Sequence, residues 1–317
     1  MGGVVLYVVN DLHGAPALIE KTVHAIEGLK PDDVLVINGD GAGSRGPIMN
    51  RIVKIYYEVR RGETEMKVLL NSVAEVIGEP PVIPQEWIYE TVHAGIFRKL
   101  LAERYRAFAE CAKKELQEVI EQTLAPLSRA AANTGVKIIY LPGNGEIVTD
   151  DFMTDDITIE RTVHPTNRFY QKIASEGFFT RFDMTYVPYI KRLTSDTVLI
   201  GTNLLDLDES SINYHLESHG LLNATISKVI VHYPPAIAPI GGAFSFWSPN
   251  KTDVQRAAAL ENILGRLAFG SDAVIYFGHI HLGAYDPRMN PYPETMGFRV
   301  KDRRCVWVKP GTVIKIV

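Results

Sequence analysis

The chain has 317 residues, and its 33 Lys and Arg against 37 Asp and Glu leave a formal charge of -4 with histidine neutral. With 46% hydrophobic and 22% charged residues, it has the composition of a globular protein with a sizeable core, which excludes disordered, collagen-like and coiled-coil architectures. The slightly acidic balance, without a run of Lys or Arg, argues against nucleic acid as a main partner.

The two cysteines, Cys111 and Cys305, stand far apart in the sequence and indicate neither a disulfide framework nor a thiolate zinc cluster. This usage fits a reducing compartment, so we expect a cytoplasmic protein. The apolar segment at residues 4–9 has the length of one strand and follows no basic segment. It therefore predicts neither a signal peptide nor a membrane span, and we expect no membrane partner.

The opening of the chain predicts a strand, a helix and a second strand. Residues 4–9 and 34–37 are short β-branched apolar runs that are typical of buried strands, and each ends at a polar cluster. Between them, residues 17–29 carry apolar side chains at helical spacing and end near Gly28 and Pro31. This order of elements indicates an α/β fold.

The rest of the chain alternates between helical and strand patterns. Helical patterns dominate residues 47–134, with the clearest apolar stripe over 97–124, and residues 136–141 then resume the strand pattern. An aromatic-rich excursion at 150–192 follows, to which the pattern assigns no element. Further strands are predicted at residues 197–200, 228–231, 273–277 and 304–308. We expect one domain over residues 1–317, in which the helical insert and the aromatic excursion either cap the functional site or serve as structural cover.

Polar residues of the kinds that bind metal ions follow several of these predicted strands. In an open α/β sheet, ligands gather outside the carboxyl ends of the strands, so residues distant in sequence would converge there. Imidazole and carboxylate suit a borderline divalent ion, and a carboxylate such as Asp40 can bridge two ions about 3.5–4 Å apart. An extended backbone at Asp11-Leu-His13 and His279-Ile-His281 would point both polar side chains of each pair to one side. The seven candidate ligands are Asp11, His13, Asp40, Asn144, His232, His279 and His281.

Five short motifs resemble, in this order along the chain, the signature of the calcineurin-like metallophosphoesterases. They are Asp11-x-His13, Gly39-Asp40, Gly143-Asn144, His232 within Val-His-Tyr-Pro-Pro, and Gly278-His279-Ile-His281. The closing Lys309-Pro-Gly-Thr312 looks like that family's final turn. Each motif is weak alone, whereas the five in order are highly specific.

The resemblance implies a fold of two packed mixed β-sheets flanked by helices, and the helical pattern at 47–134 adds an insert to it. The implied activity is hydrolysis of a phosphomonoester or phosphodiester, in which a metal-bound hydroxide attacks phosphorus. Two divalent ions would be needed, and Mn, Fe, Zn, Ni or Co would suit the ligand set. The implied ligands are Asp11, His13 and His281 on one ion, Asn144, His232 and His279 on the other, and Asp40 bridging both.

Two departures from the family's motifs concern catalysis. Arg45 resembles the Arg that binds phosphate in the Gly-Asp…Asp-Arg-Gly branch, where it would act in catalysis with Asp40 and Asn144. In this chain Ser44 replaces the Asp that precedes that Arg. The alternative is that Arg45 is a solvated cation in a loop. Gly145 stands where the family usually has the His that protonates the leaving oxygen. The general acid and its orienting Asp are thus missing together. Another histidine could supply the proton, the candidates being His164, His215 and His219.

The sequence also allows two functions other than hydrolysis, namely a metal-binding scaffold and a dinucleotide-binding protein. The loss of the general acid also fits a catalytically weak or inactive metal-binding scaffold of the same fold. Gly41-Ala-Gly-Ser-Arg-Gly46 matches the dinucleotide-binding pattern, but that fingerprint normally follows the first strand, which here ends in Asp-Leu-His. A metal-dependent phosphoesterase accounts for more of the motifs than the dinucleotide-binding alternative and retains every expected ligand.

Overall fold

The chain divides into two compact units, and all of the described strands belong to the first. The first unit comprises Met1–Gly43, Gln122–Ile147 and Tyr170–Val317, and the second comprises Ser44–Glu121 and Val148–Phe169. The structure, a computed structural model, describes residues 4–42, 51–52, 54–55, 58–59, 61–80, 94–143, 173–201, 207–237, 240, 243–244, 249, 251–280 and 292–316.

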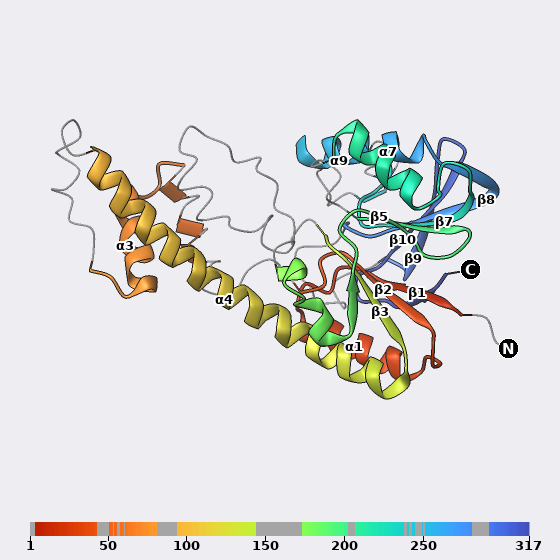
Figure 1. Ribbon diagram of the computed structural model, residues 1–317, viewed down its shortest axis with the longest axis horizontal. Helices are drawn as coiled ribbons and strands as arrows, with labels where there is room; N and C mark the ends of the chain where they lie inside the picture. The colour runs from red at the N-terminus through yellow and green to blue at the C-terminus, as the bar shows by residue number, and fades with distance from the viewer. Residues whose placement is uncertain are drawn as a thin grey trace. The chain divides into compact units, whose positions relative to one another are not determined.

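The first sheet has five strands in the order β11-β1-β2-β3-β4 (Figure 1). Strands β1 to β4 run parallel, and β11 lies antiparallel beside β1. Their bounds are β1 Leu6–Val9, β2 Val34–Asn38, β3 Lys137–Leu141, β4 Met184–Tyr186 and β11 Ile314–Lys315. The carboxyl ends of β1, β2 and β3 therefore lie at one edge of this sheet, and the segments with Asp11, Asp40 and Gly143 follow them directly.

The second sheet has six strands in the order β5-β6-β7-β8-β10-β9. The central strands β6, β7, β8 and β10 are parallel, and β5 and β9 are antiparallel edge strands. Their bounds are β5 Ile190–Arg192, β6 Thr197–Ile200, β7 Thr225–Val231, β8 Ala268–Phe277, β9 Thr295–Val300 and β10 Arg303–Val308. His232 follows β7 and His279 follows β8, so the parallel strands carry ligand candidates here as well. Both sheets are mixed.

Two apolar clusters hold the layers of the first unit together. One lies between the sheets and joins side chains of β1 and β2, such as Val8 and Val36, to Ile230 and Val306 of the second sheet. The other packs helices on the opposite face of the second sheet. Burial of apolar surface is the main favourable term in such packing. The strand residues alternate between these faces, as a pleated strand requires.

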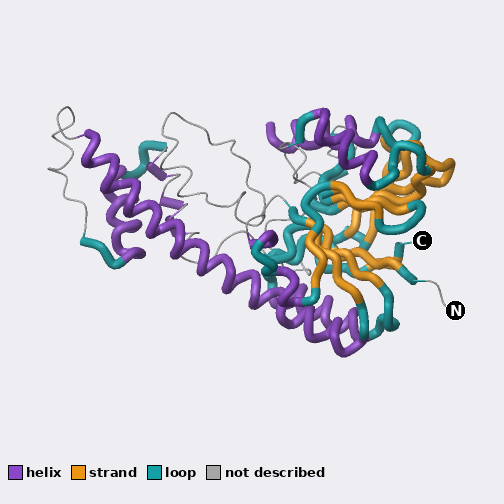
Figure 2. The backbone as a smooth tube through the Cα atoms, viewed as in Figure 1, coloured by secondary structure: helices purple, strands orange, loops and turns teal. Residues whose placement is uncertain are grey.

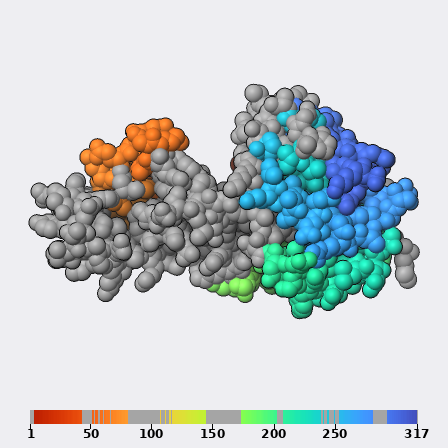
Figure 3. All heavy atoms as spheres, turned by 90° about the horizontal axis from the view of Figure 1, so that it is seen from above, coloured from red at the N-terminus to blue at the C-terminus, as the bar shows by residue number. Residues whose placement is uncertain are grey.

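Helices flank the sheets on both sides, which gives an α/β fold (Figure 2). Helix α1 (Pro16–Glu27) connects β1 to β2, and its apolar stripe buries Leu18, Ile19 and Ile26. Helices α7 (Glu209–Ser218) and α9 (Lys251–Leu264) cover the second sheet. On the face drawn in Figure 3, the described atoms of the C-terminal half of the chain, coloured from green to blue, lie next to one another. None of the described helices is long and apolar enough to cross a membrane.

The helical insert differs in extent from the sequence prediction. The helix expected over residues 97–124 is α4, which spans Ala94–Thr134 and contains Pro126. Proline removes a helical hydrogen bond, but Leu124, Leu127 and Ala131 around it are buried and supply packing that offsets this loss. Residues 122–134 belong to the first unit. Of the second unit, the structure describes α3 (Met66–Ile77), the first part of α4 and several residues before and after α3.

Part of the aromatic excursion at 150–192 belongs to the sheets rather than to a separate cap. Its described part contributes a short 3-10 helix, η2 (Phe179–Phe182), and the edge strands β4 and β5. The Phe179 ring stacks on Tyr186 with centroids 4.6 Å apart and lies 5.0 Å from the Tyr140 ring of β3. These aromatic side chains therefore pack against the core. Residues 150–172 lie outside the described residues.

The connection between β5 and β6 depends on Asp196. Its carboxylate accepts hydrogen bonds from Thr194 Oγ1 at 2.8 Å and Thr197 Oγ1 at 3.2 Å, and from the Ser227 hydroxyl of β7. The hydrogen bond from Ser227, with that from Thr194, holds the pKa of the Asp196 carboxyl below its usual range. A carboxyl with a lowered pKa stabilises the fold above its unfolded pKa, and this contribution is lost as pH falls through the folded pKa.

We expect Asp196→Ala to lower the free energy of unfolding by about 1–2 kcal/mol at neutral pH, because hydrogen bonds to a partly buried carboxylate are lost. The difference from the unmodified protein should shrink as pH falls below about 4. Urea unfolding at several pH values measures both effects. Asp272→Ala, which removes an exposed carboxylate from β8, is the matched control. A pH-independent difference would contradict the role of the Asp196 charge.

Candidate metal centre

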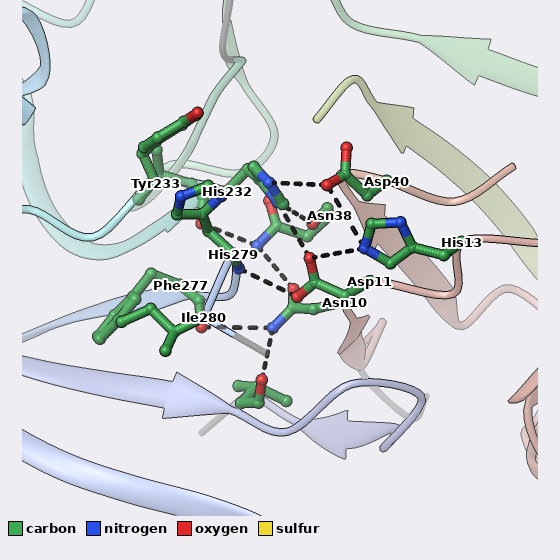
Figure 4. Close-up of polar contacts among 12 residues, drawn as sticks. Asn10, Asp11, His13, Asn38, Asp40, His232, Tyr233, Phe277, His279 and Ile280 are labelled. Atoms are coloured by element: carbon green, nitrogen blue, oxygen red, sulfur yellow. Dashed lines mark hydrogen bonds and ion pairs between the residues drawn. The ribbon is translucent and has the colours of Figure 1, made fainter. Parts of the chain in front are cut away.

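Five of the seven predicted ligands lie together where the two sheets present the carboxyl ends of their strands (Figure 4). Asp11 and Asp40 follow β1 and β2, and His232 and His279 follow β7 and β8. Asp11, His13 and Asp40 each offer one ligand atom, and these three atoms lie within 4.8 Å of one another. Asp11, Asp40 and His232 are fully buried, so their polar groups face the interior.

Two carboxylates face two imidazole rings in this cluster. Nε2 of His13 lies 3.5 Å from Oδ2 of Asp40 and 3.8 Å from Oδ1 of Asp11. Nε2 of His232 lies 3.6 Å from the same Oδ2 of Asp40, and its Nδ1 lies 3.9 Å from Oδ1 of Asp11. One oxygen of Asp40 therefore faces both rings. A carboxylate between two imidazoles can contribute to two adjacent ligand sets.

The backbone fixes the ring of His232. Its Nδ1 lies 3.0 Å from the carbonyl oxygen of Asn38, and because a carbonyl only accepts, Nδ1 donates this hydrogen bond. Nε2 then carries the lone pair in the neutral ring and points towards Asp40. Such a hydrogen bond on the opposite nitrogen is what usually orients a metal-binding histidine.

The charges in the cluster attract cations. Burial alone would lower the pKa of His232, but Asp40 and then Asp11 outweigh it and raise this pKa to about 9. In His13, burial again lowers the pKa, and Asp40 with Asp11 reverses the shift and raises it. In His279, burial prevails over Asp253 and lowers the pKa. Two buried carboxylates thus favour positive charge beside them, whether it comes from imidazolium or from a divalent ion.

The backbone of the ligand segments is not extended, so the expected reason for the pairing of Asp11 with His13 is wrong. The φ angles of Asp11, His13, Asp40 and His279 are 53°, 49°, 47° and 68°, in the left-handed region. Asp and His are tolerated there better than most residues, at a cost of roughly 1–2 kcal/mol each. Tight turns bring these side chains together. Backbone strain of this kind often clusters at functional sites.

Three glycines of the recognised motifs make room for ligands from neighbouring loops. A Cβ added at Gly39 would lie closer than 3.0 Å to Nδ1 of His232, one at Gly143 to Oδ1 of Asp40, and one at Gly278 to Oδ2 of Asp11. Real Cβ atoms essentially never approach other atoms this closely. Each of these glycines precedes one ligand candidate in the sequence and leaves room for another candidate that follows a different strand.

We expect Gly143→Ala to weaken metal binding at least about tenfold, because the added methyl group would displace the Asp40 carboxylate. Isothermal titration with Mn²⁺ measures the effect. Gly297→Ala is the control, since a Cβ at Gly297 would meet nothing within 4 Å. Equal affinity in the two variants would show that the position of Asp40 does not matter for metal binding.

Two buried asparagines, Asn10 and Asn38, for which the sequence predicts no role, connect the sheets at this edge. Nδ2 of Asn10 donates to the carbonyl oxygens of Phe277 at 3.3 Å and Val308 at 3.2 Å. Nδ2 of Asn38 donates to Oδ1 of Asn10 at 2.8 Å and to the carbonyl oxygen of Val231 at 2.8 Å. These bonds join the ends of β1 and β2 to those of β7, β8 and β10, next to the ligands.

Asp253, in the first turn of α9, also belongs to this site but could not be recognised from the sequence. Its Oδ1 lies 3.3 Å from Nε2 of His279. Nothing in the sequence distinguishes this residue, because acidic residues are common in the first turn of a helix, where they interact with the helix dipole.

The remaining predicted residues fall into two groups. His215 and His219 lie at the C-terminal end of α7, where the His215 ring packs 5.1 Å from that of Tyr189. Among the residues that the structure describes, no contact links either histidine to the five ligand candidates. The other group lies outside the described residues and consists of Ser44, Arg45, Asn144, Gly145, His164 and His281.

Comparison with known proteins assigns no family. No protein-family model matches the chain, and no curated protein does. A solved crystal structure is similar over 95% of this chain and 88% of its own chain, with 15% sequence identity and a TM-score of 0.41. A likeness this distant carries no argument about fold or function.

Proposed function

We propose that the protein is a dinuclear metal-dependent phosphoesterase with the α/β/β/α sandwich of the calcineurin-like metallophosphoesterases. The observation that carries this proposal is the convergence of the five described ligand candidates, which come from four strand ends on two sheets. Their order along the chain is that of the family's motifs. Two mixed sheets with helices on both sides also agree with this fold.

The donor set fits two divalent ions. Imidazole nitrogen and carboxylate oxygen are suitable ligands for Mn, Fe, Zn, Ni and Co. Oδ2 of Asp40 faces Nε2 of both His13 and His232, as a bridging ligand should. Asn144 and His281, which would complete the two sets, follow Gly143 and Ile280 directly in the chain. Ile280 is buried, and its carbonyl oxygen accepts a hydrogen bond of 3.1 Å from Nε1 of Trp307.

Two ions bound here would supply an activated water molecule and neutralise the charge that develops on a phosphoryl group. The protein's own residues would position these ions: Asp11, His13 and His281 on one side, His232, His279 and Asn144 on the other, and Asp40 between them. Burial of the carboxylates strengthens their attraction for cations. Arg45, five residues after Asp40 in the sequence, would hold two phosphate oxygens with its planar guanidinium group. The substrate would be a phosphomonoester or phosphodiester.

The experiment is hydrolysis of 4-nitrophenyl phosphate and bis(4-nitrophenyl) phosphate by the purified protein loaded with Mn²⁺ or Zn²⁺. We expect turnover that a chelator abolishes and added metal restores. His232→Ala should lose this activity, because it removes a buried ligand. His24→Ala, which changes a histidine with an 89% exposed side chain on α1, should keep it.

A metal-binding scaffold is the second candidate, and it is favoured by Gly145 at the position of the usual general acid. It has the same ligand set but no turnover. Two bound ions without hydrolysis of either aryl ester would therefore support the scaffold and overturn the hydrolase.

A further inference from the structure

Behind the candidate metal centre lies a second group of buried polar side chains, two of them from α9. Asp253 and Arg256 are each 5% exposed, Tyr233 is 1% exposed and His279 is 9% exposed. Burying charged groups is costly unless they are paired and hydrogen-bonded. Apolar side chains on α9 would cover the sheet without this cost. Packing alone therefore does not explain why these buried positions are polar.

The contacts in this group hold the ring of His279 on two sides. At its edge, Nε2 lies 3.3 Å from Oδ1 of Asp253. On its face, the ring of Tyr233 lies with centroids 4.2 Å apart and an interplanar angle of 31°. The Tyr233 hydroxyl accepts a hydrogen bond from the Arg256 guanidinium group, whose Cζ lies 4.9 Å from the Tyr233 ring centre. Asp253 and Arg256 of α9 thus contact His279 directly and through Tyr233, respectively.

The orientation decides which ring nitrogen is available to a metal ion. A carboxylate accepts hydrogen bonds only, so Asp253 favours the form of His279 in which Nε2 carries the proton. Nδ1 is then the unprotonated ring nitrogen. The backbone N–H of His279 also donates to Oδ2 of Asp11 at 3.0 Å, which ties this turn to the first carboxylate.

We propose that Asp253 is a positioning residue that holds His279 with Nδ1 available as a metal ligand; this inference rests on the proposed dinuclear site. A carboxylate hydrogen-bonded to the far nitrogen of a ligand histidine fixes the ring and raises its basicity. Asp253 would touch neither substrate nor ion. Loss of Asp253 should weaken the binding of the ion that His279 holds and should leave the binding of the other ion unchanged.

The experiment compares Asp253→Asn and Asp253→Ala with a control on the same helix. Glu261 of α9 pairs with Lys301 at 2.5 Å and Arg303 at 2.8 Å, so Glu261→Gln changes a carboxylate in the same way. Calorimetric titration with Mn²⁺ should show one site weakened about 10-fold in the Asn variant and up to about 100-fold in the Ala variant. The control should bind both ions as the unmodified protein does.

Two further readouts separate positioning from a general structural role. Activity on an aryl phosphate should return in the Asp253 variants at high metal concentration, because the lost affinity can be compensated by mass action. Long-range ¹H–¹⁵N spectra should show the His279 proton on Nε2 in the unmodified protein and in Glu261→Gln, and a mixture of both forms in Asp253→Ala. If Asp253→Ala does not fold, the role of Asp253 is tested with Asp253→Asn, by the same Mn²⁺ titration and the same recovery of activity at high metal concentration.

The outcomes distinguish this inference from the proposed function. Two ions in the unmodified protein with the same two affinities in both Asp253 variants would overturn the role of Asp253 and leave the dinuclear site standing. The role of Asp253 would also be overturned if both ions lost the same affinity and if high metal concentration did not restore the activity. An unmodified protein that binds neither ion would overturn the dinuclear site and, with it, the inference.

Discussion

Asp40→Asn should remove most of the affinity for both metal ions and lower kcat/KM for an aryl phosphate by about 10³-fold or more. The reason is geometric, because the same oxygen of Asp40 lies 3.5 Å from Nε2 of His13 and 3.6 Å from Nε2 of His232. An amide has no negative charge and one oxygen instead of two. Both ligand sets should therefore lose a member, whereas a change at His13 alone should affect one set.

The metal content of the purified variant, by elemental analysis after equilibrium dialysis, measures this effect. Asp208→Asn is a matched control, since Asp208 caps α7 by accepting a hydrogen bond of 2.8 Å from the Ser211 N–H. Asparagine caps helices about as well as aspartate, so this variant should keep both ions. Unchanged metal content in Asp40→Asn would refute the assignment of Asp40 as the bridging ligand.

Hydrolysis should depend strongly on the leaving group. In the proposed phosphoesterase, Gly145 stands where the family usually has its general acid, and such an acid typically contributes about 10²–10⁴-fold to the rate, most where the leaving group is poor. We therefore expect aryl phosphoesters to be hydrolysed at least about 10²-fold faster than simple alkyl esters, beyond the difference in the uncatalysed reactions. Gly145→His should reduce this difference in rate, because the added imidazole would accelerate the hydrolysis of alkyl esters.

The measurement is a series of phosphoesters with leaving groups of increasing pKa, compared in the unmodified protein and in Gly145→His. A shallow dependence in the unmodified protein would show that another group already protonates the leaving oxygen. Glutamine substitutions would then identify it among His164, His215 and His219.

Most of the core strands could be predicted because each is a continuous buried run. β2 is buried at every position, and its apolar sequence has no competing pattern. The short edge strands β4 and β5 could not be predicted, since segments of three residues carry no periodicity. They exist because β3 and β6 offer a free edge for pairing, which is a property of the assembled sheets.

The ligand candidates could be predicted for a similar reason, because parallel strands bring their carboxyl ends together whatever their separation in sequence. Asp11 and His279 are 268 residues apart and share a hydrogen bond. Asn10, Asn38 and Asp253 could not be assigned a role, since each acts through contacts that only the folded chain creates. The left-handed backbone at Asp11 and His13 could not be predicted either, because neither residue type requires that conformation.

Anomalous scattering from crystals grown with Mn²⁺ would decide whether Asp40 bridges two ions. A dinuclear site bridged by Asp40 should give two peaks about 3.5–4 Å apart, with the Asp40 carboxylate touching both, His13 beside one and His232 beside the other. A single peak, no peak, or two peaks of which only one contacts Asp40 would contradict it.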